Sequence, residues 1–397
     1  MPGVEAWLEY VRSRIPITRR KVYLDNAGAG PLSVDVRIEI DKFLNLWEEY
    51  GEPWHEALED LQRIRAEFAS FIGARADEIA AVPGVTYGLN SLLSSLKLNP
   101  NSNVVVSGIN FPTGVYAFHA MRRRGLISEV RVVEPEDGCV GVDGFEKAID
   151  DRTSIVYVDL VSWITGCVED IKEIAGIASR HGSLLVTDIF QGVGVVPVDV
   201  KSLRVDAALT GSYKWLMGLH GAGFVYVSRG LLEDLEPAYS GWMAVDDSVL
   251  ERMRRGEELF SRPFDLKRFA RAKDAKVLEW GTWPVIAFIS LKASLKLLKE
   301  FDAPGKYKTH TRRLVSRLIE GLSDMGLNVV TPPESSAAIV VFKHDRPKEL
   351  GLALSRSNIV ISVRPGSIRV SPHFYNTIDE IEHFLEAVRR FRQGVAG

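Results

Sequence analysis

The chain has 397 residues and a formal net charge of −3, with 46% hydrophobic and 25% charged residues. This length favours two domains over one simple core, and the composition is that of a soluble globular protein without a basic field for nucleic acid. No apolar run is long enough to span a bilayer, and the charged N-terminus lacks the apolar core of a signal peptide. We therefore expect a cytoplasmic protein that binds neither nucleic acid nor membrane.

Short runs that are apolar on both faces recur through the first part of the chain, as in buried parallel strands. Helical stretches alternate with them, such as Asp170–His181, which Gly182 can end. Alternation over roughly 200 residues predicts an α/β fold with a mostly parallel sheet covered by helices on both faces. The expected strands are Glu78–Val82, Val104–Val106, Ser154–Val161, Leu184–Val186 and Gly223–Val227.

The pattern changes after about residue 285, where a long helical stretch, Val285–Phe301, leads away from the sheet. The final helix begins with a capping box of Thr377 and Glu380. We expect a large α/β domain of residues 16–288 and a small α+β domain of residues 1–15 and 289–397. The charged stretch Trp242–Arg271 is predicted to be irregular. Other expected elements are helices Thr309–Met325 and Pro347–Ser355 and strands Leu327–Val330, Ala337–Phe342, Ile359–Val363 and Ser367–Val370.

The two cysteines, Cys139 and Cys167, have a spacing that predicts neither a metal site nor a disulfide framework.

Lys214 is the most informative residue. It lies between the apolar run Asp206–Leu209 and the expected strand Gly223–Val227, with an aromatic residue on each side. Burial of a lysine favours its neutral, nucleophilic amine, which suits a Schiff base with a carbonyl cofactor. A lysine beside aromatic rings more often keeps its ammonium in water, so this residue alone does not decide the function.

Other candidate groups follow strands, where ligands of open α/β sheets gather. Asp188 ends an apolar strand and can keep a proton on a pyridine nitrogen, although a helix cap is the alternative. The turn Val82–Asn90 leads into a helix whose free N–H groups favour a phosphate. Phe111 can lie on an aromatic cofactor or pack in the core. Arg369, on a strand, can hold a carboxylate through two parallel hydrogen bonds or be exposed.

Together the motifs resemble the class V aminotransferase family of pyridoxal 5'-phosphate (PLP) enzymes. This family, with an aspartate-aminotransferase-like fold, also contains cysteine desulfurases, kynureninases and isopenicillin-N-epimerase-like proteins. The similarity covers nearly the whole chain. Its motifs are Tyr23–Gly28 with Gly30–Leu32, the Thr86 turn, Asn110–Thr113, Asp188 with Gln191, Ser212–Lys214, Glu279–Thr282 and Ile368–Asn376.

The resemblance implies PLP as cofactor, with Lys214 as Schiff-base lysine and general base. It implies that Asp188 pairs with the pyridine nitrogen, Gln191 approaches the ring hydroxyl and Phe111 stacks on the ring. Thr282 would reach the partner's phosphate, so the active unit would be a homodimer with its active site at the subunit interface. The remaining implied cofactor ligands, at the phosphate end, are Val85, Thr86, Ser212 and Tyr213.

For the substrate, the resemblance implies that Arg369, or alternatively Arg364, binds the α-carboxylate. Ala27, Gly28 and Trp163 would line the pocket. Trp163 stands where desulfurases carry an asparagine near the ring hydroxyl, so the local hydrogen bonding departs from theirs.

No cysteine follows Cys167. A desulfurase needs a thiolate from its C-terminal region to accept sulfur, so we set that activity aside. We expect an aminotransferase that acts on an amino acid and a keto acid, without a metal. An isopenicillin-N-epimerase-like epimerase and a kynureninase-like lyase stay open, because both begin with removal of the Cα proton by the same residues. A cofactor-free binding protein of the same fold is a further alternative.

Overall fold

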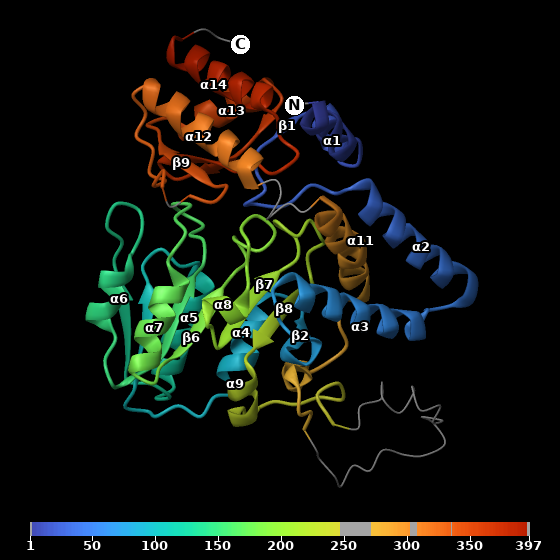
Figure 1. Ribbon diagram of the computed structural model, residues 1–397, viewed down its shortest axis with the longest axis vertical. Helices are drawn as coiled ribbons and strands as arrows, with labels where there is room; N and C mark the ends of the chain where they lie inside the picture. The colour runs from blue at the N-terminus through green and yellow to red at the C-terminus, as the bar shows by residue number, and fades with distance from the viewer. Residues whose placement is uncertain (1, 247–270, 302–307, 335, 395–397) are drawn as a thin grey trace.

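The computed structural model describes residues 2–246, 271–301, 308–334 and 336–394 (Figure 1). Most of the predicted irregular stretch Trp242–Arg271 therefore lies outside the described residues. The centre is a seven-stranded sheet of order β2-β8-β7-β6-β5-β3-β4. Only pairs that involve β8 are antiparallel in this sheet. The strands are β2 (Ile79–Val82), β3 (Asn103–Ser107), β4 (Glu129–Val133), β5 (Thr153–Asp159), β6 (Leu184–Asp188), β7 (Ala207–Gly211) and β8 (Gly223–Val227).

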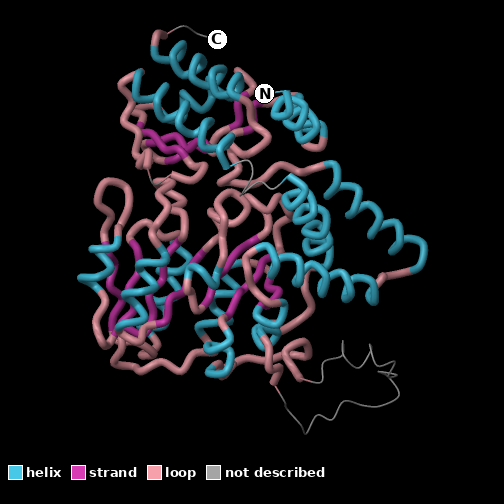
Figure 2. The backbone as a smooth tube through the Cα atoms, viewed as in Figure 1, coloured by secondary structure: helices cyan, strands magenta, loops and turns pink. Residues whose placement is uncertain are grey.

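Helices flank this sheet on both faces (Figure 2). Alternate residues of one strand enter two different cores, because successive side chains point to opposite faces. On β5, Val156 and Val158 join the core that contains α7, whereas Ile155 and Tyr157 join the core beneath α4 and α5. The predicted α/β class is confirmed. The helices here are α3 (Trp54–Phe71), α4 (Val85–Leu93), α5 (Pro112–Arg123), α6 (Val142–Ala148), α7 (Ile171–Arg180), α8 (Val200–Leu203) and α9 (Arg229–Asp234), with 3-10 turns at Ala76–Glu78 and Ala275–Leu278.

A smaller unit lies beyond the carboxyl edge of the large sheet (Figure 1). It contains an antiparallel sheet of order β11-β12-β9 and the parallel pair β1-β10, which joins the two ends of the chain. The domain boundary at residue 288 stays a prediction, and α11 (Val285–Phe301) crosses it while packing on α2 (Val34–Tyr50) and α3. The unit comprises α1 (Pro2–Ser13), a 3-10 turn (Pro16–Arg19), β1 (Val22–Tyr23), α12 (Lys308–Asp324), β9 (Val340–Lys343), α13 (Pro347–Arg356), β10 (Ile359–Val360), β11 (Ser362–Arg364), β12 (Ser367–Val370) and α14 (Ile378–Arg392).

Two local expectations have opposite outcomes. The capping box of α14 is confirmed: the Thr377 hydroxyl accepts the Glu380 N–H, and the Glu380 carboxylate accepts the Thr377 N–H, both at 3.1 Å. The prediction of a strand at Leu327–Val330 is wrong, because Val329 alone of these residues forms a bridge, an isolated one to Phe342.

Among the described helices, none combines the length and the apolar character required to cross a membrane.

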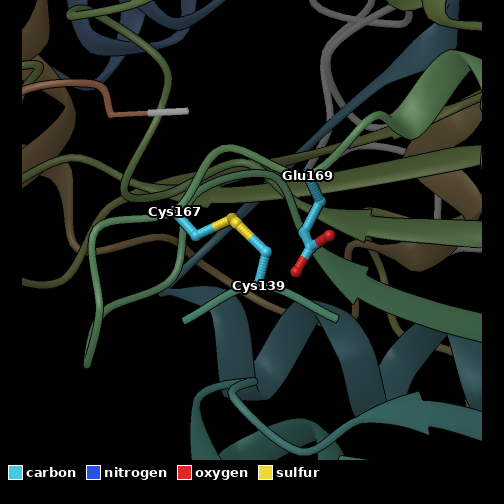
Figure 3. A group of neighbouring side chains, drawn as sticks. All are labelled: Cys139, Cys167 and Glu169. Atoms are coloured by element: carbon cyan, nitrogen blue, oxygen red, sulfur yellow. A yellow bond between two sulfur atoms is a disulfide. The ribbon is translucent and has the colours of Figure 1, made fainter. Parts of the chain in front are cut away.

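The expectation for the cysteines is also wrong. Cys139, before α6, and Cys167, in the turn after β5, form a disulfide with Cα atoms 5.6 Å apart (Figure 3). Glu169 lies beside them and accepts the N–H of Val140 at 2.9 Å. A separation of 28 residues carries no pairing signal in the sequence. The sheet topology brings the cysteines together, and the sulfurs are bonded to each other instead of being free for a metal.

This disulfide predicts a measurable contribution to stability. Cys139→Ser/Cys167→Ser should lower the free energy of unfolding by about 2–4 kcal/mol, because the bond restricts the unfolded chain. Urea unfolding of the oxidised protein and of the double variant measures the difference. Equal unfolding curves, together with two reactive thiols in the native protein, would contradict the bond.

Candidate active site

A cavity of about 340 Å³ opens at the carboxyl edge of the large sheet, where the loops after β2, β3, β5, β6 and β7 meet. This volume lies within the range of small-molecule pockets, about 300–1,000 Å³. The cavity brings together residues that are far apart in the sequence. Its lining includes eight of the predicted site residues: Val85, Thr86, Phe111, Trp163, Asp188, Gln191, Tyr213 and Lys214.

Lys214 follows β7 and is only 8% exposed. Its Nζ lies 4.3 Å from the centroid of the Phe190 ring and 5.7 Å from that of Phe111. Burial lowers the pKa of Lys214 to about 8, although the nearby Asp188 carboxylate acts in the opposite direction. A large fraction of this amine is therefore neutral and nucleophilic near pH 8.

Asp188 is the last residue of β6. Its Oδ1 accepts the N–H of Phe190 at 2.8 Å, and its Oδ2 lies 3.5 Å from the Tyr157 hydroxyl. Burial raises the pKa of Asp188 to about 6, while the Phe190 N–H and Lys214 favour the ionised form. The carboxylate is thus fixed in direction and predominantly ionised above about pH 6.

The N-terminus of α4 forms the end of the cavity that can bind a phosphate. Its cap is Gly84, which has no side chain to satisfy the first N–H groups, and the first helical bond runs from Gly88 N to Gly84 O. The N–H groups of the first turn are therefore available to an anion. The Thr86 hydroxyl lies 3.1 Å from that of Thr113 and adds a further polar group.

Phe111 and Gln191 occupy the middle of the cavity. The Phe111 ring is 42% exposed and meets the Trp163 ring edge-on, with centroids 5.4 Å apart. The Gln191 amide donates to Ala27 O at 3.1 Å and accepts from Trp215 Nε1 at 2.8 Å. One amide hydrogen of Gln191 remains for a ligand, because the NH₂ group carries two.

Ser212 and Thr282 do not line this cavity. The Ser212 hydroxyl donates to Leu219 O and its backbone N–H donates to Ala222 O, and its role toward the cofactor stays a prediction. Thr282 is exposed, and its predicted role toward a partner stays a prediction.

Two arginines flank Trp163. Arg369 is 2% exposed; its Nη1 donates to Trp163 O at 3.3 Å, and its Nη2 lies 3.5 Å from Asp25 Oδ1. Burial, and then the charge of Arg364, lower the pKa of Arg369 to about 10. The Arg364 guanidinium lies 5.5 Å above the Trp163 ring. A Cβ at Gly28 would lie 2.6 Å from Asp25 Oδ2, so glycine leaves room for that carboxylate.

Asp159 and Phe190 line the cavity beside Lys214 or Asp188 but were not among the predicted site residues. Asp159, the last residue of β5, lies inside the apolar run Ser154–Val161, and an aspartate in such a run was the available signal. Phe190 follows Asp188 by two residues and packs beneath Lys214. Nothing in its local sequence distinguishes it from a core phenylalanine.

The profile of the aminotransferase class-V family matches residues 22–384. The chain belongs to this family. It is 29% identical to an uncharacterized aminotransferase, YcbU, of Bacillus subtilis, over 96% of this chain and 97% of that protein. It is also 29% identical to a probable cysteine desulfurase of Methanothermobacter thermautotrophicus, over 94% and 95%.

Solved structures agree on the fold. The apo cysteine desulfurase of Thermococcus onnurineus NA1 has a TM-score of 0.85 at 22% identity, covering 97% of this chain and 98% of that one. A C-DES mutant whose structure holds glycine covalently linked to its PLP cofactor also has a TM-score of 0.85, at 20% identity, covering 95% and 98%.

PLP is the cofactor of this family member, and the cavity has the groups to hold it. A buried amine of lowered pKa, an ionised carboxylate and uncapped helix N–H groups lie around one space. These suit an aldehyde, a pyridine nitrogen and a phosphate, respectively.

The lowered pKa predicts how the protein takes up PLP. Covalent attachment requires the neutral amine, so its rate should be half-maximal near pH 8, where an exposed lysine would require about pH 10.4. The growth of the visible absorption band after PLP is added to the apoprotein, over a pH series, measures this rate.

Borohydride should then fix the label on Lys214. Lys214→Ala should abolish the adduct, whereas the exposed Lys97→Ala should retain it. A midpoint near pH 10, or a label elsewhere in the chain, would contradict the assignment.

Proposed function

We propose that this protein is a PLP-dependent aminotransferase that exchanges an amino group between an amino acid and a keto acid. The observation that carries the proposal is the buried Lys214 amine, of lowered pKa, beside Asp188 in one cavity at the carboxyl edge of the sheet. The class V family and the relative named as an uncharacterized aminotransferase support the same reaction type.

PLP supplies an aldehyde that joins amino groups and a ring that takes up the electron pair left when a Cα–H bond breaks. Asp188 keeps a proton on the ring nitrogen through its negative charge. Lys214, when its amine is neutral, would take the Cα proton at Nζ as general base. Phe111 lines the cavity and would stack on the cofactor ring. Arg369 binds the substrate α-carboxylate through the guanidinium edge opposite the Trp163 carbonyl.

The cysteines argue against a desulfurase, although a probable desulfurase is equally similar in sequence. That reaction needs a free thiolate able to reach the substrate sulfur. The chain has two cysteines, and they are bonded to each other as Cys139–Cys167. Neither lines the cavity.

Epimerisation and β-group elimination remain alternatives because they use the same lysine and carboxylate. A cofactor-free binding protein is less well supported, since a buried amine facing a carboxylate is unfavourable without a function.

We also propose a homodimer with active sites at the interface. Apolar side chains on one described helix support it, since α2 exposes Ile38, Leu44, Leu46, Trp47 and Tyr50, each at least 38% exposed. The cytoplasmic location stays a prediction, and the disulfide bears on it because such bonds are uncommon in reducing compartments.

The reaction type is tested by supplying single amino acids to the PLP-loaded protein, with and without a keto-acid acceptor. Transamination should consume the amino acid only with acceptor and form a new amino acid in equal amount. Loss of chirality without acceptor would instead indicate an epimerase, and release of a side-chain fragment would indicate a lyase. The absence of any visible band after PLP addition would leave only a binding protein.

The carboxylate site generates a further prediction. Arg369→Ala should raise KM for α-amino acids by the equivalent of about 2–4 kcal/mol, because a buried charge-assisted pair is lost. Steady-state kinetics measures the effect, and the corresponding amine without a carboxylate serves as control, since it should not respond. If only Arg364→Ala produces the increase, Arg364 is the carboxylate ligand.

A further inference from the structure

Asp159 is a second carboxyl group in the cavity, and the reaction described above gives it no role. It ends β5 and is paired in parallel register with Asp188, which ends β6. The two side chains are only 5% and 6% exposed, and both line the cavity. Residues two apart on a strand share a face, and Tyr157 and Val186 both join the core beneath α4 and α5. Both carboxyl groups therefore project to the same side of the sheet.

The two oxygens of Asp159 have different surroundings. Oδ2 accepts the Phe111 N–H at 2.7 Å. Oδ1 is buried and has no hydrogen-bond partner within the part of the chain that the structure describes. An unsatisfied buried polar atom costs about 1–3 kcal/mol. An atom of this kind in a ligand cavity points to a ligand that completes its hydrogen bonding.

The ionisable groups around Asp159 determine its charge. Asp188 on β6 and Glu169 before α7 oppose its ionisation, and Lys214 after β7 favours it. Tyr157, on its own strand, is neutral because burial raises its pKa well above the ordinary value. Burial, and then Asp188, raise the pKa of Asp159 well above its ordinary range. Two carboxylates that share one amine in a dry site are not both ionised, and the proposed reaction needs the charge on Asp188.

We propose that Asp159 is a positioning residue that stays a neutral carboxylic acid and donates the O–H on Oδ1 to an oxygen acceptor of the bound cofactor. This rests on the proposed function. Oδ2 then remains a carbonyl-type acceptor for the Phe111 N–H. Trp163 does not supply such a donor, because its indole N–H is bonded to Asn110 O at 3.1 Å.

The first test compares two substitutions in the full-length protein with PLP as probe. Asp159→Asn keeps a neutral donor and acceptor of the same shape, so the PLP dissociation constant should change by less than about threefold. Asp159→Ala removes the donor and should weaken binding about tenfold. Equal affinities of the Asn and Ala variants, or a large loss in the Asn variant, would overturn the proposal.

The second test observes the proton directly. Infrared spectra near neutral pH should contain a carboxylic-acid C=O band that Asp159→Asn removes and Asp206→Asn retains. Asp206→Asn is the matched control, since Asp206 is also a buried aspartate that accepts a backbone N–H, from Leu185 at 2.8 Å, but does not line the cavity. A band that persists in Asp159→Asn, or is absent from the wild type, would overturn the proposal.

The third test needs no cofactor. In the unfolded chain Asp159 ionises above about pH 4, whereas the folded protein retains the proton. The contribution of Asp159 to the free energy of unfolding should therefore fall as pH rises above about 4, so Asp159→Asn should gain stability relative to wild type over the same range. Urea unfolding of the apoproteins between about pH 5 and pH 8 measures this gain. A gain that does not vary with pH would overturn the proposal.

The failures of the two proposals are distinguishable. A wild-type protein that binds no PLP would overturn the proposed function. A protein that binds PLP but lacks the carboxylic-acid band would overturn only the role of Asp159.

Discussion

The structure depends on one constraint: the ends of several parallel strands meet in a single dry space. Because β5, β6 and β7 run in the same direction, Asp159, Asp188 and the segment that carries Lys214 all leave the sheet at one edge. Burial there disfavours charge of either sign, so the pKa of the lysine falls and the pKa values of the carboxyl groups rise. The burial that makes the Lys214 amine nucleophilic also disfavours simultaneous ionisation of the two carboxyl groups, Asp159 on β5 and Asp188 on β6.

The sequence allowed Lys214 and Asp188 to be predicted because each follows an apolar run, and strand ends are where ligands gather. Asp159 was missed because it lies within such a run, and one sequence does not say which strands are neighbours. The Cys139–Cys167 bond was missed for the same reason, since only the topology brings these residues together. The hydrogen bond from the Ser212 hydroxyl to Leu219 O could not be predicted either, because the sequence does not specify the path of the loop that carries Leu219.

The proposed carboxylate site at Arg369 depends on the two ends of the chain. Asp25 follows β1 and is bridged to Ser371, which follows β12, and the Ser371 N–H donates to Leu24 O at 2.7 Å. This pairing places Asp25 beside Arg369, whose buried guanidinium would otherwise lack a counter-ion among the described residues. A contact of 3.5 Å with Asp25 holds the arginine in place without using all of its donors. Nε and Nη2 retain unused hydrogen-bonding capacity, which supports the proposal that this arginine binds a carboxylate.

Overall similarity does not separate the activities of this family, because an uncharacterized aminotransferase and a probable desulfurase are each 29% identical to this chain. The chemistry that distinguishes them is the presence of a mobile thiolate. Here both sulfurs are in a disulfide that joins the loop before α6 to the turn after β5, which also carries Trp163. The cysteines of this chain thus support the wall of the cavity on the side of Trp163. Sulfur transfer through these cysteines would require breaking that support, whereas the proposed amino-group transfer uses the amine and the Asp188 carboxylate that the sheet edge already assembles.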